Sequence, residues 1–172
     1  MALPLKVELI LCPYDFSPSS REGLAMAITV AQAFHCELHV IHVVVTPPPH
    51  ALSQGNFAGG IRDEEHRLAE RLSEELRPKI LHDVERLGGA GVEIHAEVRE
   101  GLHEDLVIRE YAELLNADLI VIASHGRRRL ARFFLGSTAD RVVRAAPCPV
   151  LIVRPRFARE RDRLIDPEPS ES

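Results

Sequence analysis

The sequence predicts an α/β fold: a doubly wound, five-stranded parallel sheet with helices on both faces. Apolar runs that suit strands alternate from end to end with segments whose apolar residues repeat at helical spacing. Strands that alternate with helices form parallel sheets, because each helix returns the chain to the start of the next strand. The length suits one domain, expected over residues 1–155, and a flexible charged tail is expected over 156–172.

The first strand is expected at residues 7–12, an apolar run that turn residues follow. Ser17 is a good N-cap and Pro18 suits the first helical position, so a helix is expected to begin there. Its apolar residues repeat at helical spacing and are Leu24, Ala27, Ile28, Ala31 and Phe34. Residues 37–45 then form the second expected strand.

Residues 46–61 are rich in Pro and Gly and are expected to form a loop. A long helix follows, with Asp63 as its expected cap and with a kink or break expected at Pro78. Its apolar stripe is Leu68, Leu72, Leu76, Ile80, Val84 and Leu87. Gly88, Gly89 and Gly91 are expected to end it.

The remaining elements follow in the same alternation. Residues 92–98 alternate between apolar and polar side chains, which predicts a strand with one wetter face. A helix is expected at 102–115, and a buried central strand at 118–123. The last helix is expected at 137–146 with Ser137 as its cap, before a final apolar strand at Val150–Val153.

The most informative segment is Ala123-Ser124-His125-Gly126, which is followed after nine residues by Gly136-Ser137-Thr138. It leaves a buried strand and ends where a helix begins. Small residues let the backbone approach a ligand closely, and a helix start offers N–H groups and the positive end of the helix dipole. The segment therefore predicts a phosphate-binding loop. Its spacing differs from that of the Walker A loop and from that of the G-x-G-x-x-G fingerprint.

This segment resembles the G-x-x-G-x9-G-[S/T] nucleotide loop of the universal stress protein family, with Ala123 in place of the first Gly. The resemblance covers about residues 5–154. Residues 12–17 resemble the end of the family's first strand, where Asp15 follows. Residues 38–43 resemble its second strand, residues 99–101 the strand end before its third helix, and residues 145–153 its last strand.

The resemblance implies the strand order 3-2-1-4-5, a homodimer formed through Val150–Val153, and ATP, alone or with Mg²⁺, as the bound cofactor. In such sheets, ligands bind outside the carboxyl ends of the strands where the strand order reverses. The residues expected around the nucleotide are Pro13, Tyr14, Asp15 and Val43 at the adenosine end, Ile122, Ala123, His125 and Gly126 on the floor, and Arg127, Gly136, Ser137 and Thr138 around the phosphates. Arg127 belongs to a basic run that either attracts the triphosphate or forms a solvated surface.

Composition narrows the class of protein. The chain carries 21 Lys and Arg against 26 Asp and Glu, in a mixed pattern that argues against a nucleic-acid partner. No apolar run is long enough for a membrane span, and the N-terminus shows no export signal, so we expect a cytoplasmic protein with three reduced cysteines. His39 and His42 are expected to point to opposite faces of one strand, and no metal site is expected.

Three functions stay open at this point. The first is an ATP-binding regulatory module in the stress response. The second is a family member that does not bind nucleotide and acts through protein contacts, which Ala123 would favour if that position required the positive φ of a glycine. The third is a slow ATP hydrolase with Asp15 and His125 as the nearby candidate bases. A histidine in a loop more often contacts a ligand than catalyses, so no catalytic residue is assigned.

Overall fold

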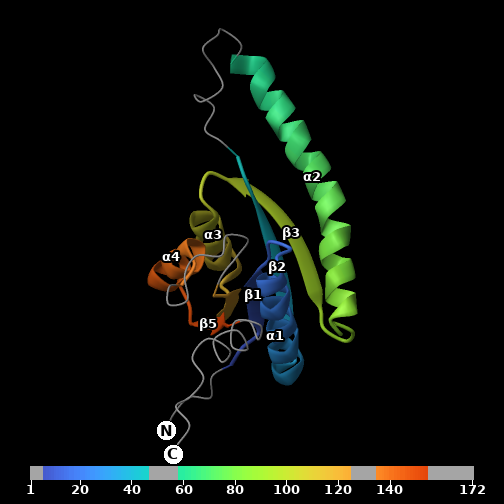
Figure 1. Ribbon diagram of the computed structural model, residues 1–172, viewed down its shortest axis with the longest axis vertical. Helices are drawn as coiled ribbons and strands as arrows, with labels where there is room; N and C mark the ends of the chain where they lie inside the picture. Colours follow the sequence, from blue (N-terminus) through green and yellow to red (C-terminus); the bar gives the residue numbers. More distant parts are fainter. Residues whose placement is uncertain (1–5, 47–57, 125–134, 155–172) are drawn as a thin grey trace, which may run out of the picture.

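The computed structural model describes residues 6–46, 58–124 and 135–154, with side chains omitted for 58–69. Strands and helices alternate along the chain (Figure 1). The elements are β1 (Leu9–Pro13), α1 (Pro18–Phe34), β2 (Glu37–Val45), α2 (Ala58–Arg86), β3 (Ile94–Gly101), α3 (Glu104–Leu115), β4 (Leu119–Ala123), α4 (Ser137–Ala145) and β5 (Val150–Val153). All strand pairs are parallel and the order is β3-β2-β1-β4-β5, which confirms the predicted fold.

Two helical layers cover the sheet. Helices α1 and α2 lie on one face, and α3 and α4 lie on the other (Figure 1). Alternate strand residues supply the two cores: Ile10 and Val40 pack with α1 and α2, whereas Leu11 and Ile41 pack with α3 and α4. Because both faces are covered, the central strands are apolar on both sides, as the continuous apolar runs in the sequence indicate.

Helix α1 begins as predicted. The N–H of Ser20 donates to the Ser17 hydroxyl at 3.1 Å, and Pro18 takes the first helical position. Phe34, the last of the apolar residues at helical spacing, is exposed. At 3.6 residues per turn it lies roughly 80° around the helix from Leu24, at the margin of the buried stripe.

Helix α2 begins earlier than predicted, and of the kink or break expected at Pro78 it shows no break. It begins at Ala58, so Asp63 is an interior residue and the expected loop ends earlier. An Asp inside a helix costs less than about 1 kcal/mol and does not prevent the helix from starting earlier. The helix also continues unbroken through Pro78. The Pro costs about 3 kcal/mol, but Ile80 and Val84 beyond it are buried against the sheet, and each such side chain contributes roughly 1.5–3 kcal/mol.

Strand β3 shows the predicted wetter face. Ile94, Ala96 and Val98 pack toward α2, while the alternate residues His95 and Glu97 lie on the other face. The strand begins two residues later than predicted and continues to Gly101, which pairs with Val45. A Cβ at Gly101 would lie 2.3 Å from the Val107 side chain, so only glycine fits where β3 turns into α3.

Helix α4 also departs from its prediction. Ser137 is the first helical residue, and the N-cap is Gly136, which has no side chain to form a capping bond. The prediction that Ser137 caps the helix is therefore wrong by one position.

Among the described helices, including the long α2, none is long and apolar enough to cross a membrane.

Candidate functional site

The strand order reverses between β1 and β4. These two strands are neighbours in the sheet, and the chain continues from β1 to β2 on one side and from β4 to β5 on the other. Because the strands are parallel, their carboxyl ends, at Pro13 and Ala123, lie at the same edge of the sheet. A crevice for a ligand forms at such a point in open α/β sheets.

Two backbone hydrogen bonds fix the polypeptide at the end of β4. The N–H of Gly136 donates to the carbonyl of Ser124 at 2.7 Å, and the N–H of Ser124 donates to the carbonyl of Val153 at 2.8 Å. Ser124 is buried. The two ends of the predicted loop therefore lie side by side, because the residue that follows β4 is hydrogen-bonded to the residue that precedes α4.

The N-terminus of α4 is thus held beside the end of β4. The first helical bond runs from the N–H of Asp140 to the carbonyl of Gly136 at 2.8 Å. The N–H groups of the first turn have no partners within a helix, and they lie at the positive end of its dipole. Ser137 is exposed at this position and Thr138 is half-buried. This arrangement suits an anion such as a phosphate.

Glu104 is a residue of this region that sequence reasoning missed. The hydroxyl of Thr138 donates to Oε2 of Glu104 at 2.7 Å, which joins the first turns of α3 and α4. A carboxylate therefore lies next to the predicted phosphate site. No spacing in the sequence reveals this pair, because it depends on how two helices pack.

Asp15 follows β1 and shapes the turn into α1. Its Oδ1 accepts the N–H of Ser17 at 3.0 Å, and the next residue, Phe16, has a positive φ of 63°. This is the local role of an Asx turn. The turn sets the carboxylate at the carboxyl end of β1, so its structural role and its predicted ligand contact do not exclude each other.

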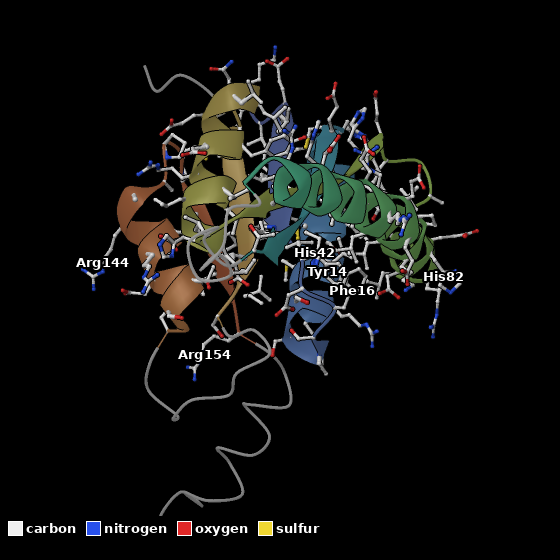
Figure 2. All side chains as sticks on the ribbon, turned by 90° about the horizontal axis from the view of Figure 1, so that it is seen from above. Tyr14, Phe16, His42, His82, Arg144 and Arg154 are labelled. Carbon is white, nitrogen blue, oxygen red and sulfur yellow. The ribbon has the colours of Figure 1, made fainter. Side chains whose placement is uncertain are left out.

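Tyr14 has a structural role on the face of the sheet that α1 and α2 cover. Its buried ring packs with α1 and α2, its hydroxyl donates to Asp83, and its carbonyl lies 2.7 Å from Nδ1 of His42. Figure 2 shows Tyr14, Phe16 and His42 gathered near one another. Burial, and then the Asp83 carboxylate, raise the pKa of Tyr14 above its ordinary value. Its contact with a nucleotide stays a prediction.

Three further residues of the predicted site lie in the sheet. Val43, expected at the adenosine end, and Ile122, expected on the floor, pack on the α3 and α4 side, and the floor residue Ala123 ends β4. Ala123 is not among the described residues with positive φ. It faces Gly23 of α1, where an added Cβ would lie 3.4 Å from that of Ala123. This position therefore needs a small side chain, not the backbone freedom of glycine. His125, Gly126 and Arg127 lie outside the described residues.

The cysteines offer no reactive thiolate. Cys12, Cys36 and Cys148 are free thiols. Burial raises the pKa of Cys12 to about 12, and it also raises the pKa of Cys36 and of Cys148. A thiol whose pKa is raised stays protonated and unreactive near neutral pH.

Residues 7–154 match the sequence model of the Universal stress protein family. The chain belongs to this family. A universal stress protein from Methanocaldococcus jannaschii is 36% identical over 146 residues, which cover 84% of this chain and 81% of the relative. Among solved structures, the universal stress protein UspA from Lactobacillus plantarum superposes with a TM-score of 0.68 at 24% identity, over 87% of this chain and 99% of that one.

A further structural relative is a universal stress protein that was solved in complex with cAMP. It has a TM-score of 0.61 and 20% identity, and the match covers 87% of this chain and 98% of that one. At these identities the structural matches show the shared fold. The fold and the family predicted from the loop motif are therefore both confirmed for this universal stress protein.

Proposed function

We propose that this universal stress protein binds ATP in the crevice between the carboxyl ends of β1 and β4, and that it acts as a nucleotide-binding regulatory module in the stress response. The observation that carries this proposal is the hydrogen bond between Gly136 and Ser124. It places the start of α4 at the point where the strand order reverses, which is where α/β sheets bind ligands.

The phosphate end of the nucleotide would lie against α4. The backbone N–H groups of Ser137 and Thr138 and the Ser137 hydroxyl would donate to phosphate oxygens. Hydrogen bonds to charged groups contribute roughly 1.5–3 kcal/mol each. Glu104 beside Thr138 would repel a bare triphosphate. Mg²⁺ prefers carboxylate and phosphate oxygens, so its presence would relieve this repulsion, and we propose Mg·ATP as the ligand.

The nucleoside end would lie toward β1. Asp15 is held there by the N–H of Ser17, and its carboxylate would accept from the ribose or the base. Structural relatives solved in complex with cAMP and with dAMP support a nucleotide as the class of ligand. The backbone of Ala123 also supports the proposal, since an alanine is accommodated there without positive φ.

The test is calorimetric titration of protein that has been stripped of small molecules, with ATP and with Mg·ATP. We expect saturable binding of one nucleotide per chain, stronger with Mg²⁺ than without it. Thermal denaturation with and without Mg·ATP gives an independent measurement, because a ligand that binds the folded state raises its melting temperature. If neither method detects binding at millimolar Mg·ATP, the alternative of a family member that acts through protein contacts replaces the proposal.

A further inference from the structure

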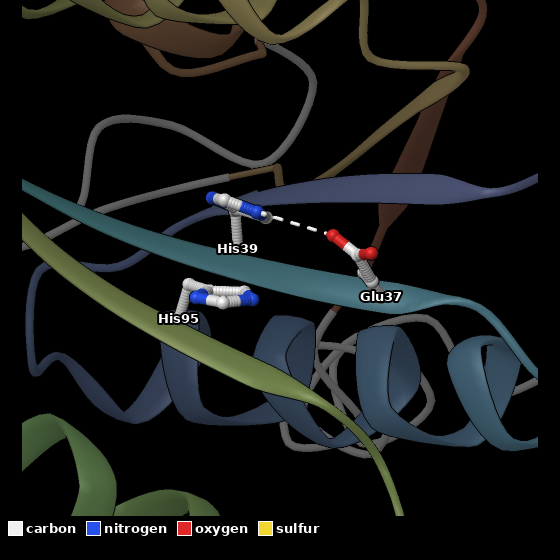
Figure 3. A group of neighbouring side chains, drawn as sticks. All are labelled: Glu37, His39 and His95. Carbon is white, nitrogen blue, oxygen red and sulfur yellow. Dashed lines mark ion pairs between the residues drawn. The ribbon is translucent and has the colours of Figure 1, made fainter.

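Three side chains of the kinds that bind transition metals lie together near the amino ends of two strands, at the opposite end of the sheet from the proposed nucleotide crevice. They are Glu37 and His39 of β2 and His95 of β3 (Figure 3). Parallel register pairs His39 with His95, and Glu37 precedes His39 by two residues, so all three share one face. One ligand atom from each lies within 4.8 Å of the others.

His39 is the best positioned of the three. Its side chain is only 11% exposed, its Nδ1 lies 3.3 Å from the Tyr111 hydroxyl, and its Nε2 lies 3.8 Å from Oε2 of Glu37. With the proton on Nδ1, where it donates to Tyr111, the lone pair of Nε2 faces the Glu37 carboxylate. A hydrogen bond donated by the second ring nitrogen is the usual support for a metal-binding histidine. Burial, and then the neighbouring His95, lower the pKa of His39 and favour its neutral form.

The surrounding charges favour a cation. Glu93 lies 3.5 Å from Nε2 of His95 and adds a second carboxylate to that of Glu37. The nearby arginines are directed elsewhere: Arg77 pairs with Glu97 at 2.9 Å, and the guanidinium of Arg99 lies over the Tyr111 ring at 4.8 Å. The carboxylates of Glu37 and Glu93 therefore place negative charge next to the two imidazoles.

We propose that Glu37, His39 and His95 bind a Zn²⁺ ion, with water completing a four-coordinate site. Two imidazoles and one carboxylate form a donor set that Zn²⁺ accepts readily, whereas Mg²⁺ and Ca²⁺ prefer oxygen donors alone. Three protein ligands and one water leave a position that a further ligand can reach.

The required rearrangement is small and falls on the exposed residues. Tetrahedral Zn²⁺ with bonds of about 2.1 Å places its ligand atoms roughly 3.4 Å apart, closer than the present group. The rings of His39 and His95 are stacked with centroids 4.5 Å apart, so the His95 ring must turn to direct a nitrogen at the ion. The side chains of Glu37 and His95 are 46% and 44% exposed and have room to move, while the buried His39 stays in place.

The test uses the whole chain of 172 residues, treated with a chelator and titrated with Zn²⁺ alone, without nucleotide. Calorimetry is expected to show one Zn²⁺ per chain, and X-ray absorption a shell of nitrogen and oxygen at about 2.0–2.1 Å. His95→Gln and Glu37→Gln should each weaken binding at least tenfold. The matched controls are His82→Gln and Glu22→Gln. His82 lies on the outer side of α2 (Figure 2), and Glu22 lies on α1; both substitutions should leave the affinity unchanged.

Three results would overturn the proposal: no binding at millimolar Zn²⁺, a sulfur ligand in the absorption spectrum, or unchanged affinity in His95→Gln. A sulfur ligand would assign the ion to a cysteine. Both ligand variants alter half-exposed side chains, so circular dichroism is expected to confirm that they fold. Because no nucleotide is present, these results are independent of whether the protein binds ATP.

Discussion

The N–H of Gly136 donates to the carbonyl of Ser124 across 2.7 Å, although eleven residues separate them in the sequence. This bond makes the distance between β4 and the start of α4 independent of the chain between them. Gly136 itself has ordinary angles, φ −56° and ψ 148°, which any residue can adopt. Its lack of a side chain, and not its backbone, is therefore the property that matters for a ligand.

Gly136→Val is expected to abolish detectable ATP binding while leaving the fold intact. The β-branched side chain would fill the space in which we place the phosphates, and the extended backbone tolerates it. Gly136→Ala, with one added methyl group, should weaken binding less. Calorimetry measures the affinity, and thermal denaturation measures the stability. If Gly136→Val binds ATP as the wild type does, the phosphates do not lie at this position.

Asp15→Asn is expected to weaken ATP binding about tenfold and to leave binding of inorganic triphosphate unchanged. The amide keeps an oxygen to accept the N–H of Ser17, so the turn is preserved, while the charged acceptor for the nucleoside is lost. A hydrogen bond to a charged group contributes roughly 1.5–3 kcal/mol, and 1.4 kcal/mol is a factor of ten. Equal loss for both ligands would place Asp15 at the phosphates or in the fold alone.

Glu104→Gln is expected to raise the affinity for ATP in the absence of Mg²⁺ several-fold and so to reduce the advantage of Mg·ATP. The glutamine still accepts the Thr138 hydroxyl but no longer repels phosphate. The matched control is Glu110→Gln, an exposed residue farther along the same helix. If the ratio of the two affinities does not change in Glu104→Gln, the carboxylate does not face the phosphates.

We propose that the protein forms a homodimer through β5, and Leu151→Lys with Ile152→Lys is expected to give a monomer. β5 is an edge strand, and these two apolar side chains are 38% and 37% exposed. Apolar edge strands favour pairing with a second chain, and lysines oppose it. Light scattering measures the mass. Leu114→Lys on α3 is the control, since it changes an exposed leucine away from β5.

Neither tyrosine is expected to ionise near pH 10 while the protein is folded. Burial is the main cause that raises the pKa of both Tyr14 and Tyr111, the two tyrosines of the chain. Above pH 10 the unfolded chain loses these protons and the folded chain keeps them, so stability falls as the pH rises. Tyrosinate absorbance should therefore appear together with loss of the circular dichroism signal. Its appearance at pH 10 with an unchanged signal would contradict this.

Much of the fold was predictable, because the residues that mark the ends of individual elements agree with the order of the strands in the sheet. Ser17 and Pro18 mark the start of α1 where the structure has it, and the resemblance of the loop after β4 led to the strand order. The start of α2 predicted at Asp63 was wrong, because a capping residue marks only one of several positions at which a helix can begin. Ser137 misled because a glycine one position earlier is the cap.

Contacts between elements were not predictable. The expected opposite faces of His39 and His42 are confirmed, since His39 lies near Tyr111 of α3 and His42 near Phe16 beside α1. For the proposed zinc site, the important neighbour of His39 is His95, and only the register of β2 with β3 brings these two residues together. The pair of Thr138 and Glu104 likewise requires the packing of α3 on α4. The expected contacts of His125, Gly126 and Arg127 and the expected tail lie outside the described residues.

The two borders of the sheet differ in chemistry. The β5 border is apolar, whereas one face of the β3 border carries the charged residues Glu97 and Arg99 beside His95. A sheet with two apolar borders could add chains indefinitely and grow into a fibre. Because charged side chains discourage strand addition at β3, growth through the proposed β5 interface would end after one step. The same asymmetry that would permit a dimer would therefore protect the protein from polymerising.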